Sequence, residues 1–155
     1  MANTSRVLKL DIINRQRIKK IAAKKLKISL EKAMRPLSSC FTETSSSRFI
    51  RISVVLCDNS FITGLNKKYL KKNIPTDVIA FELKDSEGPG YIGEVFVSVQ
   101  EAVLRSPEYG FTWQKELNLY IVHGVLHLAG YSDCNKKERK RMEAKQQEIL
   151  RKIFG

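Results

Sequence analysis

One segment, residues 123–133, constrains the fold of this chain more than any other, because it holds both of the chain's histidines. His123 and His127 stand four residues apart in an apolar run, and side chains at this spacing lie one above the other on the same face of a helix. Gly130 follows three residues later and is expected to end that helix in the left-handed conformation. The chain would then turn back and bring Asp133 to the two histidines.

Two imidazoles and one carboxylate are ligands that suit a zinc ion, although other divalent transition metals also bind them. Three protein ligands leave the fourth position of a tetrahedral site open, as in catalytic rather than structural zinc sites. Cys134 is an alternative third ligand, but it stands one residue beyond the offset of Asp133. Helical histidines that only pack and bind carbonyl groups are the simpler alternative. The glycine and the carboxylate at fixed offsets favour a metal site made of His123, His127 and Asp133.

The same segment reads H-x3-H-x2-G-x2-D, which is close to the spacing of metzincin peptidases. In those enzymes a glutamate directly after the first histidine is the general base for peptide hydrolysis. Gly124 takes that position here. Peptide hydrolysis is therefore disfavoured, and a metallohydrolase of another substrate, peptides included, is the least favoured functional class.

The residues resemble the YbeY endoribonuclease family much more closely. The family signature HGxLHLxGYDH aligns without a gap on residues 123–133, and three short segments around it also match: Lys115-Glu-Leu, Met142-Glu143 and Glu148-Ile-Leu. Upstream, residues 73–81 (NIPTDVIAF) are similar to the family's DxPTDVLSF, and residues 93–97 (GEVFV) to its GDIxI strand. The resemblance covers about residues 50–150 in the family's order.

This resemblance implies a metal-dependent, single-strand-type endoribonuclease that acts in the maturation of small-subunit ribosomal RNA and in ribosome quality control. It implies one zinc ion as cofactor, held at positions 123, 127 and 133, and RNA, the ribosome or ribosomal proteins as partners. Asp77 and Glu94 are polar residues of the matching segments and are the candidates for catalysis. Four nearby residues are the candidates for RNA contacts: Tyr69, Lys71, Lys72 and Thr76.

Three residues depart from the family pattern. Asp133 stands where the family has a third histidine, Leu70 where an arginine follows the family's tyrosine, and Ala80 where it has a serine. Lys71 and Lys72 supply charge beside Leu70, but lysine lacks the planar fork of a guanidinium group. A second hypothesis is therefore a ribosome-associated RNA-binding or assembly protein of the same fold with reduced or lost catalysis.

The charge of the chain indicates a polyanionic partner. The formal net charge is +12, from 28 basic and 16 acidic side chains. Residues 1–35 carry eleven basic and two acidic side chains, residues 135–155 eight and three, and residues 36–134 nine and eleven. Such an excess of one sign favours a polyanion as partner. RNA or the ribosome fits better than an anionic membrane.

The cellular compartment of the protein is predicted from three patterns that the sequence does not contain. No stretch reaches the roughly 18 to 20 apolar residues of a transmembrane helix, and lysines interrupt residues 18–30, unlike the core of a signal peptide. The three cysteines, Cys40, Cys57 and Cys134, form no CxxC pair, which is typical of a reducing compartment. We expect a cytoplasmic protein without a membrane partner, of unassigned oligomeric state.

The hydrophobic pattern predicts one α+β domain over residues 1–155, with a small mixed sheet of about four strands and about five helices. The metal site would lie on a helix in the C-terminal part of the chain and on the loop after it. Strands are expected over 8–14, 49–56, 78–83 and 91–97, and helices over 18–34, 58–69, 98–105, 113–129 and 136–153. The first helix would be basic, with its apolar residues from Ile18 onward facing inward. Asp58 and Asn135 are expected as N-caps. Polar loops are expected over 38–47 and 88–90.

Overall fold

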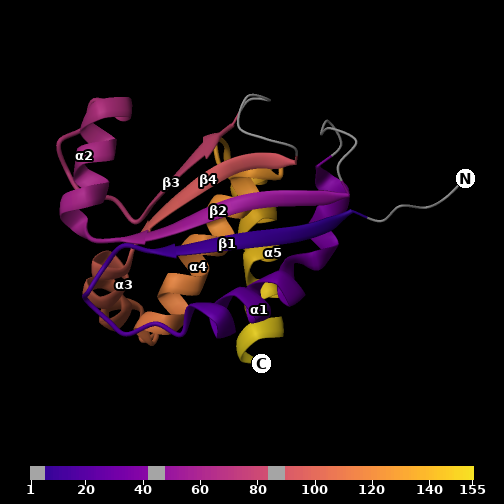
Figure 1. Cartoon of the computed structure of the whole chain (residues 1–155), viewed down its shortest axis with the longest axis horizontal. Helices are drawn as coiled ribbons and strands as arrows, with labels where there is room; N and C mark the ends of the chain where they lie inside the picture. Colours follow the sequence, from indigo (N-terminus) through magenta and orange to yellow (C-terminus); the bar gives the residue numbers. More distant parts are fainter. Residues whose placement is uncertain (1–5, 42–47, 84–89) are drawn as a thin grey trace, which may run out of the picture.

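A four-stranded sheet forms the centre of the protein (Figure 1). The computed structural model describes residues 6–41, 48–83 and 90–155. Its strands are β1 (Val7–Asn14), β2 (Phe49–Cys57), β3 (Val78–Glu82) and β4 (Tyr91–Ser98), and their order across the sheet is β1-β2-β4-β3. β1, β2 and β4 run parallel, whereas β3 is antiparallel to β4. The predicted mixed sheet is confirmed.

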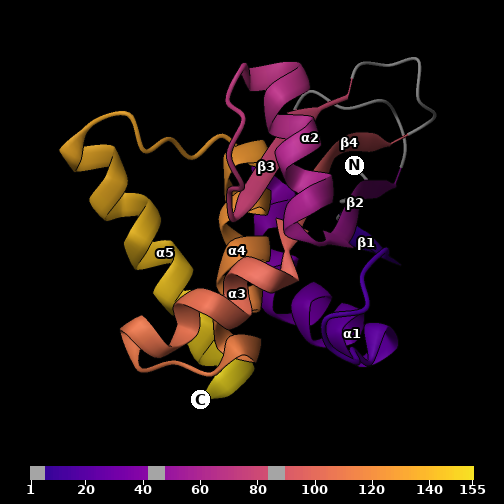
Figure 2. The ribbon, with the colours of Figure 1, turned by 90° about the vertical axis from the view of Figure 1, so that its left-hand side faces the viewer.

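The described residues also form five α-helices: α1 (Ala23–Met34), α2 (Asn59–Leu70), α3 (Val99–Arg105), α4 (Trp113–Leu128) and α5 (Lys136–Phe154). α4 packs on β3 and β4 and contacts α1, α3 and α5. Figure 2 shows α4 between the sheet and α5. The predicted α+β fold is confirmed, and in the described part of the chain no helix is long and apolar enough to cross a membrane.

Side chains alternate between the two faces of the sheet, so β2 divides the core into two parts. Ile52, Val54 and their neighbours at alternate positions point to the face that α1, α4 and α5 cover, and are fully buried there. Val55 points to the other face, where it packs with Ile62 of α2 and Phe96 of β4. Full burial of such side chains stabilises the fold by about 1.5–3 kcal/mol each. This alternation decides which residues of β4 can face α4.

The predicted helix ends depend on local side-chain bonds, and two of these are confirmed. The Asp58 carboxylate accepts a hydrogen bond from the backbone nitrogen of Phe61 (2.9 Å), and the Asn135 side chain accepts one from that of Glu138 (2.8 Å). Each side chain satisfies a backbone donor in the first turn of its helix. All predicted strands and the last four helices agree with the structure to within one residue.

The helix predicted over residues 18–34 begins only at Ala23, so the prediction is wrong in its first part. The side chain of Gln16 accepts hydrogen bonds from the backbone nitrogens of Ile18 (2.8 Å) and Lys19 (3.0 Å) and donates one to the carbonyl oxygen of Lys19 (2.9 Å). Such side-chain bonds compete with helical ones. Ile18, predicted to face inward, is 41% exposed. Of the two predicted loops, residues 42–47 and 88–89 lie outside the described residues, and residues 35–40 form a short 3-10 helix.

Candidate metal centre

α4 carries both histidines and lies unusually close to the sheet at the residue between them. A Cβ atom added to Gly124 would lie 2.5 Å from Cγ1 of Val95 and 3.1 Å from Cγ2 of Val78. Real Cβ atoms essentially never lie as close as 2.5 Å to another atom, so a side chain here would force Val95 to shift, whereas glycine fits. The position at which a metzincin carries its glutamate therefore faces the sheet here. The packing gives an independent reason why this site lacks the peptidase base.

The end of α4 turns the chain back as predicted. Gly130 has a φ of +100°, and its backbone nitrogen donates to the carbonyl oxygen of His127 (3.1 Å). The nitrogen of Tyr131 donates to the carbonyl oxygen of Leu126 (3.0 Å). These two bonds and the left-handed glycine make a Schellman motif, which satisfies carbonyl groups that a helix end leaves without partners. The reversal places Asp133 beside the two histidines.

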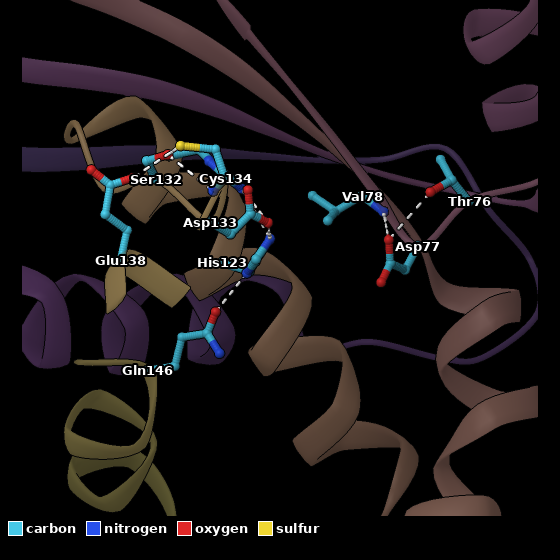
Figure 3. Close-up of polar contacts among 10 residues, drawn as sticks. Thr76, Asp77, Val78, His123, Ser132, Asp133, Cys134, Glu138 and Gln146 are labelled. Atoms are coloured by element: carbon cyan, nitrogen blue, oxygen red, sulfur yellow. Dashed lines mark hydrogen bonds and ion pairs between the residues drawn. The ribbon is translucent and has the colours of Figure 1, made fainter. Parts of the chain in front are cut away.

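The three predicted ligands form one group, and Figure 3 shows two of them, His123 and Asp133, side by side. The Nε2 atoms of His123 and His127 are 3.0 Å apart, and Oδ2 of Asp133 lies 3.8 Å from the first and 3.6 Å from the second. Ligands placed at the corners of a tetrahedron about 2.0 Å from a zinc ion are about 3.3 Å apart. The group therefore matches the size of a zinc site with little rearrangement. The Asp133 side chain is 49% exposed, so the site opens to solvent.

The protonation state of His127 favours ion binding. Burial lowers the pKa of His127 below its ordinary value, and the neighbouring His123 adds to this effect, whereas Asp133 and the backbone of Tyr131 oppose it. Because the pKa is depressed, the ring is neutral at neutral pH. A neutral imidazole is the form that binds a metal ion.

Gln146 of α5 orients the first histidine, and the sequence did not reveal this role. Its Oε1 atom lies 2.5 Å from Nδ1 of His123 (Figure 3). Because an amide oxygen only accepts, Nδ1 carries the proton, and the lone pair of Nε2 points to the metal group. The signal in the sequence was a single amide within the inward stripe of α5, beside Met142, Ile149 and Leu150. A buried polar side chain in such a stripe has to find a partner across the helix interface.

Cys134, the alternative third ligand, has other partners. Its Sγ atom accepts a hydrogen bond from the Ser132 hydroxyl (3.0 Å) and donates to Oε2 of Glu138 (3.0 Å). The hydrogen bond from Cys134 lowers the pKa of Glu138. In the described part of the chain, the group that could hold an ion contains Asp133 and not Cys134. The geometry favours the carboxylate.

Asp77 and Thr76 lie together before β3, away from the ligand group. Oδ1 of Asp77 accepts hydrogen bonds from the nitrogen of Val78 (2.8 Å) and from the Thr76 hydroxyl (3.3 Å). Figure 3 draws these residues apart from His123. Both bonds are local and hold the turn that begins β3. A catalytic role for Asp77 stays a prediction.

Glu94 points to the opposite face of the sheet from α4. Its neighbour Val95 faces α4 at Gly124, and successive side chains of a strand point to opposite faces. The residue that pairs with Glu94 on β3 is Phe81, which packs in the cluster under α2. The structure therefore does not bring Glu94 together with the metal ligands, and its catalytic role stays a prediction that the fold does not support.

Three of the four predicted RNA contacts, Tyr69, Lys71 and Lys72, lie at the end of α2. Tyr69 is 52% exposed and packs edge-on against Phe81, with ring centroids 5.1 Å apart. Lys71 and Lys72 follow as exposed residues, and Leu70, which stands where the family has arginine, is 51% exposed. An aromatic ring and two ammonium groups on one exposed turn could contact bases and phosphates, respectively.

Comparison with known proteins points to one family. The family model described as "Endoribonuclease YbeY" matches residues 11–154. Endoribonuclease YbeY of Neorickettsia sennetsu is 37% identical over 131 residues, which cover 84% of this chain and 89% of that protein. The protein of the same name from Bacillus licheniformis is 40% identical over 109 residues, covering 64% and 69%. The solution structure of TM1509 from Thermotoga maritima has a TM-score of 0.62 at 25% identity and covers 94% of this chain and 89% of that one.

Proposed function

The chain belongs to the endoribonuclease YbeY family, and from this premise we propose that it is an endoribonuclease whose activity depends on an ion at His123, His127 and Asp133. The observation that carries the metal dependence is the spacing of the three donor atoms, 3.0, 3.6 and 3.8 Å. Zinc suits two imidazoles and one carboxylate. We further propose that the substrate is ribosomal RNA, in single-stranded regions of the small-subunit precursor, and that the protein meets it at ribosomes in the cytoplasm.

Residues around the ligand group would keep both histidines ready to bind the ion that acts on a phosphodiester. Gln146 keeps the lone pair of His123 Nε2 directed at the ion, and the depressed pKa of His127 keeps the second ring neutral. When bound, a zinc ion supplies Lewis acidity to the phosphodiester and to the attacking water. Asp133 brings one negative charge to the ligand set, so the site attracts a divalent cation strongly but withdraws less charge from the substrate than three neutral imidazoles would.

Positioning of RNA would fall to the turn after α2. Tyr69 offers an exposed ring for a base, and Lys71 and Lys72 offer ammonium groups for phosphates, while the Thr76 hydroxyl is already bonded to Asp77. Each phosphate contact releases counterions, so affinity depends on salt. Lys71→Ala together with Lys72→Ala should lower the slope of log affinity against log salt by about 0.7 for each lysine. An unchanged slope would remove these two lysines from the RNA site.

A cleavage assay tests the enzyme directly. The purified protein is incubated with a structured ribosomal RNA fragment and, in parallel, with a peptide substrate, each with and without a chelator, after its metal content has been measured. We expect RNA cleavage that the chelator abolishes and that zinc restores, and no peptide cleavage. His123→Ala is the matched control for a contaminating nuclease, which would cut equally in both preparations. RNA cleavage that survives in the chelator would contradict the proposal.

The second candidate, an RNA-binding relative without catalysis, is favoured by Leu70 and Asp133. Asp133→Ala should weaken metal binding, whereas Asp133→His should keep the ion and let cleavage extend to lower pH, because one negative charge leaves the ligand set. Cys134→Ala serves as the control and should keep the ion. If the parent binds RNA without metal and Asp133→His restores both ion and cleavage, the second candidate is the better description. If only Cys134→Ala removes the metal, the thiolate is the ligand.

A further inference from the structure

The first two turns of α5 carry a dense group of cations, which we call the basic turn. Its five residues are all exposed: Lys136, Lys137, Arg139, Lys140 and Arg141. In the described part of the chain, none of them forms an ion pair with a carboxylate. Farther along α5 charges of both signs occur and can pair, as Lys145 and Glu148 do (3.2 Å). The basic turn is therefore a separate feature of the helix.

This placement opposes the electrostatics of the helix itself. The start of a helix is the positive end of its dipole, so cations there are unfavourable and carboxylates favourable. α3 and α4 follow that rule, with Glu101 and Glu116 in their first turns. α5 also has one carboxylate, Glu138, in its first turn, but Lys136, Lys137 and Arg139 outnumber it there. A segment that keeps an excess of cations against the dipole of its own helix is a candidate for function.

The basic turn lies directly beside the metal group. Its first residue follows Asp133 by three positions, and the Cys134–Glu138 bond ties the turn to the loop that carries Asp133. The guanidinium of Arg141 lies 5.4 Å from the ring centroid of Tyr131 in the same loop. Farther along α5, Gln146 contacts His123. Figure 3 shows Glu138 beside the loop residues Ser132 and Cys134, and Gln146 on the other side of His123 from Asp133. An anion held by the basic turn would therefore border the metal ligands.

We propose that the basic turn binds the phosphate backbone of single-stranded RNA and holds the strand against the metal group. The inference rests on the proposed function, since it assigns the substrate's path to that site. A polyanion fits this surface because five exposed cations without a carboxylate ion pair, on a dipole end that is also positive, attract several negative charges. Phosphates along one strand provide these, whereas a single small anion does not.

The test compares two matched double variants. Lys136→Gln with Lys137→Gln removes two charges from the first turn of α5, and Lys24→Gln with Lys25→Gln removes two exposed charges from the first turn of α1. α1 has no carboxylate in its first turn, and it starts just after Lys19, which contacts Trp113 at the other end of α4 from the histidines. The two pairs therefore share the unfavourable dipole position and differ in distance from the metal group.

Both variants are measured for binding to a single-stranded ribosomal RNA fragment over a range of salt concentrations, in chelator so that no cleavage occurs. We expect the α5 variant to lower the salt slope by about 1.4 units, about 0.7 for each lysine, and to raise the KM of cleavage when metal is restored. The α1 variant should change neither. Both variants should raise Tm by roughly 1 to 3 °C, because each removes repulsion from a helix start.

The outcomes separate this inference from the proposed function. If the parent neither binds nor cleaves RNA, the proposed function fails. If the parent does both and the α5 and α1 variants behave alike, only the role of the basic turn is overturned. Equal RNA binding by parent and α5 variant, with a loss of binding to anionic phospholipid vesicles in the α5 variant alone, would assign the basic turn to a membrane surface and also overturn the inference.

Discussion

α4 and α2 both end in a residue with left-handed backbone, and the two ends differ in what that residue is. Gly130, two residues after α4, has a φ of +100°, and Lys71, directly after α2, has a φ of 60°. Glycine adopts this region freely, whereas a residue with a side chain is destabilised there by about 1–2 kcal/mol. In the described residues, Lys71 is the only residue other than glycine with a positive φ. The left-handed residue is thus relaxed after one helix and strained after the other.

The two left-handed residues differ because the two turns position different groups. Gly130 needs no side chain, because its task is to reverse the chain so that Asp133 reaches the histidines. At the end of α2 the turn is held by Asn66, whose side chain donates to the carbonyl oxygen of Ile74 (2.9 Å) and whose carbonyl oxygen accepts from the nitrogen of Lys72 (3.2 Å). A lysine at the strained position keeps an exposed ammonium group in the turn. Backbone strain of this kind is typical of functional positions.

The largest effect on metal binding and stability should come from removal of a metal ligand at the C-terminal end of α4. His123→Ala or His127→Ala should abolish binding of the ion, because two ligands rarely hold a transition metal against water. An ion present at 100 times its Kd stabilises the native state by about 2.7 kcal/mol. Zinc should therefore raise the Tm of the parent by roughly 5 to 10 °C and that of the variants not at all. Equal metal content in parent and variants would show that these histidines do not bind the ion.

Gln146 tests whether the orientation of His123 matters beyond its presence. Gln146→Ala should weaken metal affinity about 10- to 100-fold, as is typical when a partner of a metal-binding histidine is lost. Gln146→Glu keeps an acceptor for Nδ1 and should restore or increase affinity. NMR of the metal-free protein should show the proton of His123 on Nδ1 in the parent and in the glutamate variant. An unchanged tautomer and affinity in Gln146→Ala would limit this residue to packing.

The sequence predicted those features that depend on contacts between residues close in the chain, and it missed those that depend on contacts between distant residues. The metal group was predictable because three ligands and the turning glycine lie within eleven residues and follow helix geometry. Gln146 was not, because its contact with His123 spans 23 residues and depends on how α5 packs on α4. The orientation of Glu94 depends on which face of β4 packs on α4, and the sequence of a strand with both faces partly buried does not reveal it. The start of α1 was mispredicted because a side chain, Gln16, overrides the apolar pattern.

A backbone substitution at the relaxed end should have a smaller effect than loss of a ligand. No atom lies within 4 Å of a Cβ built on Gly130, so Gly130→Ala adds only backbone strain. The free energy of unfolding should fall by about 1–2 kcal/mol, and metal affinity should fall as Asp133 is held less firmly.

Gly64→Ala within α2 is the matched control. Its added Cβ also meets nothing within 4 Å, but it should stabilise the helix by about 0.5–1 kcal/mol. A loss at Gly64 equal to that at Gly130 would contradict the backbone explanation.

The smallest effect on the free energy of unfolding is expected at Lys71, after α2. There the substitution to glycine should stabilise the protein rather than destabilise it. Lys71→Gly removes the left-handed penalty but adds disorder to the unfolded chain, so the net gain in the free energy of unfolding should be about 0.5–1 kcal/mol. Lys71→Ala removes the same ammonium group and keeps the strain, so its stability should stay close to that of the parent. Urea unfolding of the three proteins therefore separates backbone from charge. If lysine is kept at this position for its charge, both variants should bind RNA more weakly by a similar factor, although only the glycine variant is more stable. Weaker RNA binding in the glycine variant alone would instead show that the strained backbone itself shapes the RNA contact.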